Sequence, residues 1–477
     1  MSRIPYHKIQ EADLAVFESI VGKEAVWTNP SQLYDYAHDE TENLMFYPEV
    51  VLFPESTSHI SQILKYCQIQ KIPVTTRGAG TSLSGGALPV CGGVVLSTKK
   101  MNRILKIDTE NFQAMVEPGV VNYDLQKALE PYGLFYPPDP ASWQISTIGG
   151  NVAHASGGPK AVKYGTTRDY VLNLEVVLPN GEVIWTGANT LKYATGYNLT
   201  HLFIGSEGTL GIITKIVVKL IPKVPYSILM LFSFESAIEA CKAINTIFLN
   251  HITPSALEFM ERDAILWSIQ YNTIKGLPIH DQTQALLLIE LESKDMDTLW
   301  KEVEQVHLLM QSYRLAAEAL IAETEEEKNT LWAIRRKVGE AVKSHSVYKE
   351  EDTVVPRAYL PELLKQVKLI GKKYGFRSVC YGHAGDGNLH VNIIKGDMSD
   401  DKWNQELPMA IQEIFEVCKN LGGTISGEHG IGWVQKNYLP IVFQDAHFQL
   451  FLGIKKVFDP NYILNPLKII PDKWWML

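Results

Sequence analysis

The sequence is poor in cysteine, and this limits the kinds of site that the chain can build. Five cysteines are scattered over 477 residues, and no two are spaced as Cys-x-x-Cys. The spacing excludes an iron–sulfur or zinc–thiolate cluster built within this chain. Isolated cysteines fit a reduced compartment, in which they are usually small core residues. The five are Cys67, Cys91, Cys241, Cys380 and Cys418.

Long apolar runs are also lacking. The longest stretches, such as Tyr226–Phe234, are far shorter than the roughly 18 residues that a membrane helix needs. The N-terminus, MSRIPYHKIQEADLAVF, lacks the apolar region of a signal peptide and is typical of an amphipathic helix. We therefore expect a cytoplasmic protein, or one that is peripheral on the inner face of the membrane.

An excess of positive charge is absent too. The net charge is −9, with 20% charged and 46% hydrophobic residues. An acidic chain offers no basic surface field to a nucleic acid, so we expect no nucleic-acid partner. The length predicts two or three domains.

The first half of the chain contains a strand–helix–strand pattern. Val50–Phe53 and Ile72–Thr76 are typical strands, and Ser56–Gln70 is an amphipathic helix that Ser56 can cap. Such a unit predicts a parallel pair of strands. Further strands are expected at Val94–Ser97, Arg103–Ile107, Ala114–Glu117, Tyr170–Leu178, Val183–Thr186 and Thr209–Leu220.

From about Pro222 the pattern changes to longer strand–helix units. Strands at Ser227–Phe234 and Ala285–Glu292 each precede a helix, which indicates a separate α+β domain. The expected helices are Glu235–Asn250, Asp295–Tyr313, Glu325–Ser344, Ala358–Tyr374 and Asp400–Leu421.

Three loops are rich in glycine, serine and threonine: Arg77–Pro89, Ser146–Val171 and Gly205–Thr214. The first, RGAGTSLSGGALP, is no Rossmann fingerprint, because no helix pattern follows it and Leu83 replaces the third glycine. Its backbone N–H groups can still form a nest for a pyrophosphate. Each loop alone could be a tight surface turn, but three together favour a large cofactor lying across the domain.

The stretch YGHAGDGNLHVN, Tyr381–Asn392, predicts strand, tight turn and strand. Seven positions apart on one straight strand, His383 and His390 would face opposite sides. The intervening Gly-Asp-Gly makes a turn, so the two imidazoles are expected near each other.

Seven stretches, from about Val50 to Pro466, resemble the FAD-linked oxidases that have a vanillyl-alcohol-oxidase (PCMH-type) FAD domain. The resemblance is narrower to the branch that contains the FAD-bearing subunit of glycolate oxidase, D-lactate dehydrogenase and D-2-hydroxyglutarate dehydrogenase. The matching stretches are RGAGTSLSGG, PPDPASWQISTIGGNVA, SGGPKAVKYGTTRDYVLNLEVVLPNGEV, GYNLTHLFIGSEGTLGIIT, YGHAGDGNLHVN, SGEHGIG and DPNYILNP.

The resemblance implies an α+β fold with four parts. An N-terminal helical segment (1–45) precedes a PCMH-type FAD-binding domain (46–223). A ferredoxin-like α+β substrate or cap domain (224–430) would carry a metal site. A C-terminal segment (431–477) would return to the FAD domain.

The resemblance also implies FAD as the cofactor. The binding is expected to be non-covalent, because residues 77–89 contain no histidine to which the flavin could be tethered. The implied cofactor-binding residues are Arg77, Gly78, Ala79, Gly80, Thr81, Ser82, Gly85, Gly86, Pro138, Thr147, Gly149, Gly150, Asn151, Ala153, Gly157, Tyr164, Glu207, Gly211, Ile212 and Asn465. The chain departs from the family pattern at His154 and at Leu467, where the tail usually reads Asn-Pro-Gly.

A divalent metal is implied by the same resemblance. His383, His390 and Glu428 match its ligand positions, and two histidines with a carboxylate are a common open catalytic site. Zinc is the first choice, with manganese or iron as alternatives. The competing interpretation is two ordinary core histidines and a surface Glu-His pair.

Two further residues match catalytic positions of the family, and His429 matches the general base. Asn392, on the same face of its strand as His390, is expected to donate to a substrate oxygen. Arg335, in a Trp-x-x-Arg segment, is expected to clamp the substrate carboxylate. The alternative for Arg335 is a solvated helix arginine beside Arg336 and Lys337.

The implied reaction is oxidation of a D-2-hydroxy acid to the 2-keto acid. Gly339 and Glu350 stand where the 2-hydroxyglutarate enzymes carry a threonine and a lysine, which favours D-lactate or glycolate over a dicarboxylate. Electrons would leave through a quinone, a cytochrome, an electron-transfer flavoprotein or an iron–sulfur subunit, and the assembly would be a homodimer or a hetero-oligomer. The alternatives are a D-2-hydroxyglutarate dehydrogenase, a non-catalytic FAD-bearing electron-transfer subunit and a His/His/Glu metallohydrolase.

Overall fold

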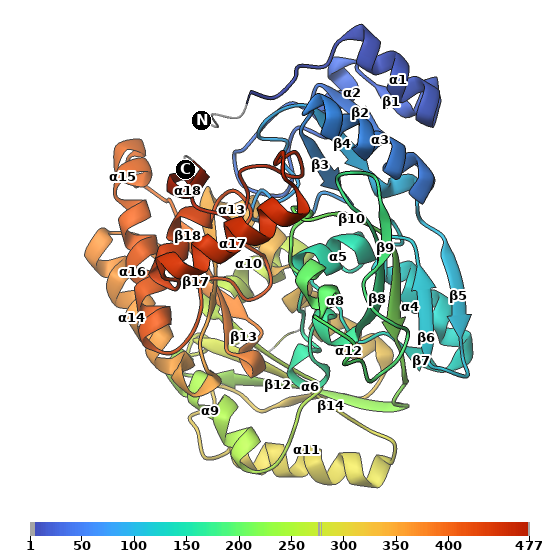
Figure 1. Ribbon diagram of the computed structural model, residues 1–477. Helices are drawn as coiled ribbons and strands as arrows, with labels where there is room; N and C mark the ends of the chain where they lie inside the picture. Colours follow the sequence, from blue (N-terminus) through green and yellow to red (C-terminus); the bar gives the residue numbers. More distant parts are fainter. Residues whose placement is uncertain (1–4, 275–276, 278, 476–477) are drawn as a thin grey trace. The chain divides into compact units, whose positions relative to one another are not determined.

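The computed structural model describes residues 5–274, 277 and 279–475 (Figure 1). Residues 1–4 of the expected N-terminal segment and 476–477 of the expected C-terminal segment lie outside this description. The chain divides into two compact units. Unit 1 comprises Met1–Gly157, Thr166–Lys223 and Glu428–Leu477, and unit 2 comprises Gly158–Gly165 and Val224–Gly427.

Unit 1 contains two main sheets and a set of short helices. Its strands are β1 (Val26–Trp27), β2 (Val50–Leu52), β3 (Val74–Arg77), β4 (Val94–Ser97), β5 (Ile104–Asp108), β6 (Gln113–Val116), β7 (Leu134–Phe135), β8 (Val171–Val177), β9 (Val183–Trp185), β10 (Ile212–Lys219) and β11 (Ile221–Pro222). Its helices are α1 (Glu11–Val21), α2 (Pro30–Tyr34), α3 (Thr57–Gln70), α4 (Asn122–Leu129), α5 (Ile148–His154), α7 (Thr167–Tyr170), α8 (Leu199–Phe203), α17 (Asp445–Phe458) and α18 (Asp472–Trp475).

The first sheet has the order β1-β2-β4-β3. The predicted pairing of the two strands around α3 is wrong in one respect. β2 and β3 each run parallel to β4, which lies between them. All four residues of β4 are buried, which suits a central strand. The connection through α3 therefore joins two strands that are separated by β4, whereas the sequence pattern predicted that they are neighbours.

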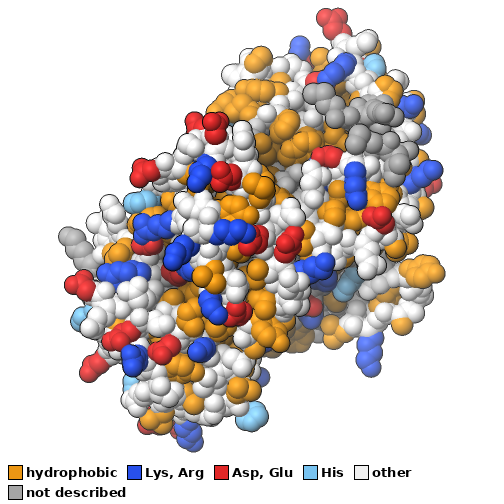
Figure 2. Space-filling view, turned by 90° about the vertical axis from the view of Figure 1, so that its left-hand side faces the viewer, with side chains coloured by type: hydrophobic (Ala, Val, Ile, Leu, Met, Phe, Trp, Pro, Cys, Tyr) orange, Lys and Arg blue, Asp and Glu red, His pale blue; other side chains and the backbone are white. Residues whose placement is uncertain are grey.

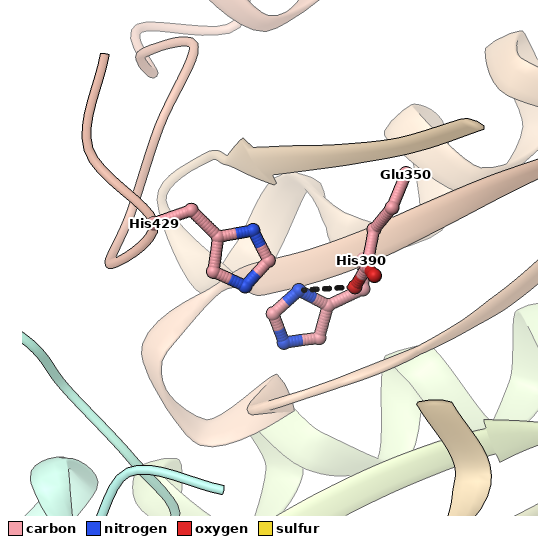
Figure 3. Close-up of side chains that lie close together, drawn as sticks. All are labelled: Glu350, His390 and His429. Atoms are coloured by element: carbon pink, nitrogen blue, oxygen red, sulfur yellow. Dashed lines mark ion pairs between the residues drawn. The ribbon is translucent and has the colours of Figure 1, made fainter. Parts of the chain in front are cut away.

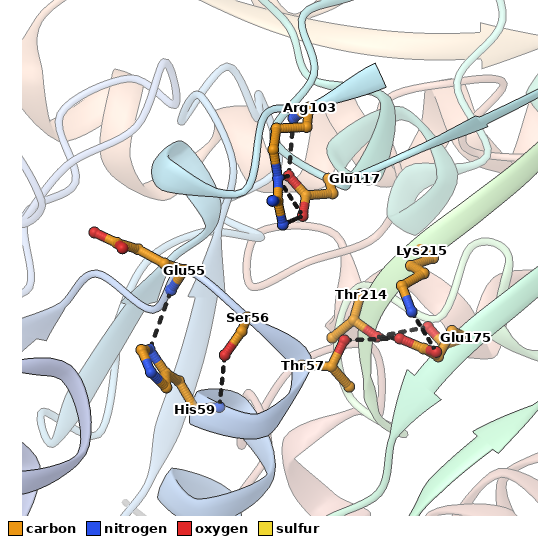
Figure 4. Close-up of polar contacts among 9 residues, drawn as sticks. All are labelled: Glu55, Ser56, Thr57, His59, Arg103, Glu117, Glu175, Thr214 and Lys215. Atoms are coloured by element: carbon orange, nitrogen blue, oxygen red, sulfur yellow. Dashed lines mark hydrogen bonds and ion pairs between the residues drawn. The ribbon is translucent and has the colours of Figure 1, made fainter. Parts of the chain in front are cut away.

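Helix α3 forms as the sequence predicts. Ser56 caps it by accepting a hydrogen bond from the backbone N–H of His59 at 3.2 Å (Figure 4). Its buried stripe comprises Ile60, Ile63, Leu64 and Cys67.

The second sheet is antiparallel, with the order β5-β6-β10-β8-β9. Glu175 of β8 is buried and joins this sheet to α3 (Figure 4). Its carboxylate accepts from the Thr57 hydroxyl at 2.7 Å, from the Thr214 hydroxyl at 2.9 Å and from the Lys215 ammonium at 2.9 Å. A buried charge with three donors stabilises the connection instead of costing the full desolvation penalty.

The C-terminal segment returns to the first sheet. The backbone N–H of Asn465 donates to the carbonyl of Val74 at 2.8 Å, and the N–H of Val74 donates to the carbonyl of Ile463 at 2.7 Å. The tail therefore extends the sheet at β3, next to the start of the first glycine-rich loop.

Unit 2 is built on one sheet of seven antiparallel strands, in the order β15-β12-β14-β13-β17-β18-β16. Its strands are β12 (Tyr226–Phe234), β13 (Ala256–Glu261), β14 (Ala285–Ser293), β15 (Leu320–Ala322), β16 (Tyr348–Val354), β17 (Arg377–Gly382) and β18 (Asn388–Ile394). Its helices are α6 (Ala161–Tyr164), α9 (Ala237–Leu249), α10 (Arg262–Asn272), α11 (Met296–Met310), α12 (Glu325–Arg336), α13 (Val338–His345), α14 (Leu360–Tyr374), α15 (Asp400–Gln405) and α16 (Leu407–Asn420).

The first half of this sheet has ferredoxin-like topology. The chain order is β12, α9, β13, α10, β14, α11 and β15, which is βαββαβ with α10 inserted between β13 and β14. The spatial order β15-β12-β14-β13 is the order 4-1-3-2. The helices α9 and α11 pack on these strands (Figure 1). β17, β18 and β16 then extend the sheet beyond β13.

Two helices that the periodicity predicts as continuous are broken. The segment 325–344 divides at Lys337, where no proline or glycine marks the break, so the sequence pattern runs through it. The segment 400–421 divides at Glu406, and Pro408 is the second residue of the next helix, because it has no N–H with which to continue the first.

The surface carries charges of both signs. On the face shown in Figure 2, acidic and basic side chains are interspersed and do not gather into a patch of one sign. Among the residues that the structure describes, no helix has both the length and the apolar character that a membrane span requires.

Candidate functional site

The first glycine-rich loop leaves β3 at Arg77 and is anchored by that side chain. The buried guanidinium of Arg77 donates to the carbonyls of His38 at 2.7 Å and of Asp35 at 3.1 Å. Gly80 has φ +78°, and a Cβ there would overlap the same guanidinium. Arg77 therefore shapes the loop through backbone contacts, and Gly80 is required for the close approach.

The second loop packs against the first at the start of α5. Thr147 caps α5 by accepting from the N–H of Gly150 at 3.2 Å. A Cβ on Gly78 would lie 2.5 Å from the Thr147 hydroxyl, and a Cβ on Gly149 would lie 2.5 Å from the ring of Pro118. Glycine is needed at both positions because backbone atoms meet where side chains have no room.

The third loop joins the other two through Glu207. This buried residue has φ +50°, and its N–H donates to the carbonyl of Ala153 at 2.9 Å. The carboxylate accepts from the N–H groups of Ile431 and Gly432, each at 2.8 Å. The Asn465 amide donates to the carbonyls of Gly86 at 2.8 Å and of Glu207 at 2.7 Å. The tail thus ties the first and third loops together.

The loops of unit 1 present buried polar atoms that have no partner among the described residues. They are the Thr76 and Ser146 hydroxyl oxygens, the Asn151 amide nitrogen and the Asn465 amide oxygen. Leaving four such atoms unsatisfied is costly, so a polar ligand that bonds them would stabilise the loops. The phosphates, ribitol and ring edge of FAD fit this requirement.

Most of the other predicted cofactor-binding residues lie on the same loops of unit 1. Gly85 donates its N–H to the hydroxyl of Thr41 at 2.7 Å, and the carbonyl of Pro138 accepts from the Asn122 amide at 2.9 Å. Gly211 lies against Val176, and Ile212 is buried in β10. Tyr164 belongs to unit 2 instead, and its hydroxyl donates to Glu292. Ala79 is exposed, and Thr81 and Ser82 are half-buried.

Glu428 and His429 begin the last segment of unit 1. Their backbone is held by the first loop and by α5, because the carbonyl of His429 accepts from the Ser84 hydroxyl at 3.0 Å and lies 3.1 Å from Nδ1 of His154. A Cβ on Gly157 would lie 2.9 Å from the Glu428 carboxylate. His154, the departure from the family pattern, therefore supports the segment that carries the predicted base.

The predicted hairpin of unit 2 is confirmed. β17 and β18 are antiparallel with Tyr381 opposite His390, and a short 3-10 turn at Ala384–Asp386 joins them. The rings of His383 and His390 meet edge to face, with centroids 5.4 Å apart. Both side chains are buried. The turn therefore brings together the two imidazoles that a straight strand would have separated.

His383 contacts a glutamate that sequence reasoning missed. Glu258 of β13 is fully buried, and its two carboxylate oxygens lie 2.9 and 3.0 Å from Nδ1 of His383. The Nε of Arg335 donates to the same carboxylate at 2.6 Å. Burial alone would raise the pKa of Glu258, but His383 and Arg335 outweigh it and lower the pKa, so the carboxylate is ionised. The only sequence signal was a lone acidic residue inside the apolar run Ala256–Met260.

Arg335 is buried, whereas its neighbour Arg336 is exposed. The alternative of a solvated helix arginine is therefore wrong. The guanidinium lies over the ring of Tyr381, with the central carbon 5.1 Å from the ring centroid. Its Nη2 has no hydrogen-bond partner among the residues that the structure describes. A buried guanidinium with an unsatisfied donor is suited to bind an anion.

His390 lies among polar side chains of neighbouring strands. Its Nδ1 is 3.5 Å from Oε1 of Glu350 (Figure 3) and 3.8 Å from Oδ1 of Asp352. Tyr381 lies beside them, and its hydroxyl donates to Glu350 at 3.4 Å. Burial, and after it the Glu350 carboxylate, raise the pKa of Tyr381 well above its ordinary value, so the hydroxyl keeps its proton. Asn392 is fully buried on the same strand as His390.

The chain enters the Glu428 segment from a fixed point of unit 2. The N–H of Gly427 donates to the carboxylate of Asp352 at 2.7 Å, and the hydroxyl of Ser426 donates to it at 2.9 Å. Asp352 also accepts from the amide of Asn388 at 2.7 Å. The carboxylate of Asp352 thus accepts three hydrogen bonds, and one of them holds Gly427, the residue that precedes Glu428.

Two family models match the chain. The "FAD binding domain" matches residues 48–187, and "FAD linked oxidases, C-terminal domain" matches residues 224–469. These two matches cover the first two glycine-rich loops and the histidine hairpin, and the third loop, Gly205–Thr214, lies between the two matched ranges.

Curated proteins of similar length are also similar in sequence. The chain is 41% identical over 437 residues to the glycolate oxidase subunit GlcD of Bacillus subtilis, which covers 91% of each chain. It is 37% identical over 477 residues to the D-lactate dehydrogenase of Anaerostipes hadrus, covering 98% of this chain and 99% of that one. It is 31% identical over 460 residues to the D-2-hydroxyglutarate dehydrogenase of Stutzerimonas stutzeri, covering 95% and 97%.

A solved structure of p-cresol methylhydroxylase with substrate bound has the same fold. The TM-score is 0.78 at 20% identity, over 97% of this chain and 98% of that chain. The expected PCMH-type fold is therefore confirmed.

Proposed function

The chain belongs to the FAD-linked oxidases, in the branch of glycolate oxidase, D-lactate dehydrogenase and D-2-hydroxyglutarate dehydrogenase, and we propose that it oxidises a small D-2-hydroxy acid. D-lactate or glycolate would be converted to the corresponding 2-keto acid. The observation that carries this proposal is the buried Arg335, whose Nη2 has no protein partner among the described residues and suits a substrate carboxylate.

FAD is the cofactor of this family, and the three loops of unit 1 would hold it without a covalent bond. Bound FAD supplies a two-electron acceptor for the hydrogen on the substrate's carbinol carbon. Gly78 and Gly149 let the loops pack closely against Thr147 and Pro118, and the unsatisfied polar atoms at Thr76, Ser146, Asn151 and Asn465 would bond the cofactor.

His383, His390 and Glu428 would hold a divalent cation, with zinc first and manganese or iron as alternatives. Nδ1 of His383 lies 2.9 Å from a carboxylate oxygen of Glu258, which leaves Nε2 of this ring with the lone pair that a cation needs. Glu428 follows Gly427 directly, and consecutive Cα atoms are about 3.8 Å apart. A bound cation would lower the pKa of the substrate hydroxyl.

The remaining steps belong to side chains of the protein. Arg335 would pair with the substrate carboxylate through its free edge and fix the position of the carbinol carbon. Asn392 would donate a hydrogen bond to a substrate oxygen. The neutral imidazole of His429 would take the hydroxyl proton, which suits a group whose ordinary pKa is near 6.5.

Glu350 supports a monocarboxylate substrate. Its half-buried carboxylate lies 3.5 Å from His390 Nδ1, so it brings negative charge close to the proposed cation site. A second carboxylate on the substrate would be repelled there, whereas D-lactate and glycolate have none. D-2-hydroxyglutarate is the alternative substrate.

The test is anaerobic mixing of the purified protein with D-lactate, L-lactate, glycolate and D-2-hydroxyglutarate. The flavin absorbance is followed with and without a chelator. We expect bleaching by D-lactate or glycolate, loss of bleaching on chelation, and recovery with zinc or manganese. A yellow protein that none of the four acids bleaches would contradict the substrate class.

The electron acceptor is proposed to be a separate carrier. A quinone, a cytochrome, an electron-transfer flavoprotein or an iron–sulfur subunit would reoxidise the flavin, either in a homodimer or in a hetero-oligomer. Stopped-flow reoxidation of the bleached protein by each class of carrier would distinguish them.

A further inference from the structure

Glu258 is an unusual residue for the middle of a sheet. It lies on β13 between Leu257 and Phe259, and its side chain is fully buried. Transfer of an ionised carboxylate into a protein core costs several kcal/mol unless partners compensate for the lost hydration. The partners of this buried charge therefore decide what it does in the fold.

The strand register brings Glu258 to His383. β13 and β17 run antiparallel with Phe259 opposite Gly382, so Glu258, which precedes Phe259, is opposite His383, which follows Gly382. Both carboxylate oxygens of Glu258 lie within 3.0 Å of Nδ1 of His383. This arrangement keeps a proton on Nδ1, fixes the rotation of the ring and directs Nε2 away from the carboxylate.

The same carboxylate also fixes Arg335. Its Oε2 accepts from Nε of Arg335 at 2.6 Å, and the Tyr381 ring lies under the guanidinium plane. The bond from Nε to Glu258 and the contact with the Tyr381 ring fix the plane of the guanidinium. Its Nη2 has no hydrogen-bond partner among the described residues. One side chain thus orients a proposed cation ligand and the proposed carboxylate clamp together.

We infer that Glu258 is a positioning residue that couples the cation site to the substrate-carboxylate site. This inference rests on the proposed function. Nδ1 of His390 has longer separations from its neighbouring carboxylates, 3.5 Å from Glu350 and 3.8 Å from Asp352.

The test compares Glu258→Gln with a matched control on the neighbouring strand. Glu290 of β14 is also a buried glutamate with a cationic partner, Lys160, at 2.5 Å. Each variant, Glu258→Gln and Glu290→Gln, is purified with its flavin, stripped of metal and titrated with zinc against a chromogenic chelator. Flavin content and thermal unfolding report whether the variant is folded.

We expect Glu258→Gln to bind zinc about 10- to 100-fold more weakly than the wild type, the usual effect of removing such a partner of a metal-binding histidine. Glu290→Gln should bind zinc as the wild type does. In turnover, excess zinc should restore kcat of Glu258→Gln, while the raised KM for the hydroxy acid remains, because the cation cannot reorient Arg335.

The two possible failures are distinguishable. A wild-type protein that binds no zinc and no manganese would overturn the proposed cation site, and the inference with it. A wild type that binds zinc while Glu258→Gln binds it equally, with an unchanged KM, would overturn the inference alone. Should Glu258→Gln lose its flavin, Glu258→Asp takes its place. It retains the charge but moves it by one methylene, and unchanged zinc affinity and KM in that variant would also overturn the inference.

Discussion

The two units of this protein present their functional atoms in different ways. In unit 1, glycines at 78, 80 and 149 let backbone segments pack closely, and the buried polar atoms proposed to bond a ligand are uncharged side-chain hydroxyls and amides. In unit 2, the proposed site consists of ionisable side chains on neighbouring elements: Glu258, Arg335, His383, His390 and Glu350.

The difference predicts two kinds of sensitivity. A site built from backbone fails when an atom is added, because a new Cβ occupies the space of the ligand or of a neighbouring loop. A site built from charged side chains fails when one charge is removed, because its partner is left buried and uncompensated. Substitutions can therefore separate cofactor retention from chemistry.

The largest effect is expected at His429, where backbone and side chain have separate tasks. His429→Ala keeps the carbonyl that Ser84 and His154 contact, so flavin should remain bound. Loss of the proposed base should lower kcat by roughly 10²- to 10⁴-fold. Flavin absorbance and anaerobic reduction rates measure the two quantities. His201→Ala, on the short helix α8, is the control. Normal turnover in His429→Ala would contradict the assignment of His429 as the base.

Arg335→Lys tests the proposed site of unit 2, which consists of ionisable side chains. Lysine retains the charge but lacks the planar edge that binds a carboxylate through two N–H groups. We expect KM for the hydroxy acid to rise roughly 10- to 100-fold, since a hydrogen bond to a charged group contributes about 1.5–3 kcal/mol. Arg336→Lys, at the exposed neighbour, should leave KM unchanged. Equal KM values in the two variants would contradict the clamp.

Gly149→Ala tests the close backbone packing of the glycine-rich loops in unit 1. The added Cβ would lie 2.5 Å from the ring of Pro118, so the free energy of unfolding should fall by about 1–3 kcal/mol and flavin occupancy should decrease. Gly453→Ala in α17 is the matched control, because a Cβ there meets no atom within 4 Å and alanine favours a helix. Denaturant unfolding and flavin release measure both. Full flavin occupancy in Gly149→Ala would contradict the prediction, because it would show that the loop can accommodate a Cβ at this position.

The smallest effect is a pH dependence in unit 1, where a charged side chain supports a backbone-built loop. Burial lowers the pKa of Lys468 to about 7 from 10.5, although Asp39 and Glu207 act in the opposite direction. Its ammonium donates to the carbonyls of Gly85 and of Leu88. From pH 7 upwards the unfolded chain holds a proton that the folded lysine has lost, so the free energy of unfolding should rise with pH.

The expected rise is about 1 kcal/mol between pH 7 and 8 in flavin-free protein. Lys468→Met should remove this rise in the free energy of unfolding between pH 7 and 8, whatever the substitution does to the stability at pH 7. Denaturant unfolding at several pH values measures the slope. Parallel curves for the two proteins would contradict the assignment.

Local patterns in the sequence predicted much of this molecule. The cap at Ser56, the apolar stripe of α3 and the Gly-Asp-Gly turn between two strands follow from the preferences of nearby residues. The family resemblance supplied FAD, and the matched domains rule out the metallohydrolase alternative. The ligand set, the base and the substrate remain proposals.

Pairings between distant strands were beyond such patterns. The insertion of β4 between β2 and β3, and the break of the predicted helix 325–344 at Lys337, depend on which surfaces meet in the folded chain. The sequence by itself determined the glycine loops, the histidine hairpin and the absence of cluster cysteines, because each is a property of neighbouring residues. Only the tertiary structure decided that Glu258 lies against His383 and Arg335, because 125 residues separate Glu258 from His383 and 77 separate it from Arg335. The pairing of β13 with β17 brings His383 to Glu258, whereas Arg335 reaches it from the helix α12.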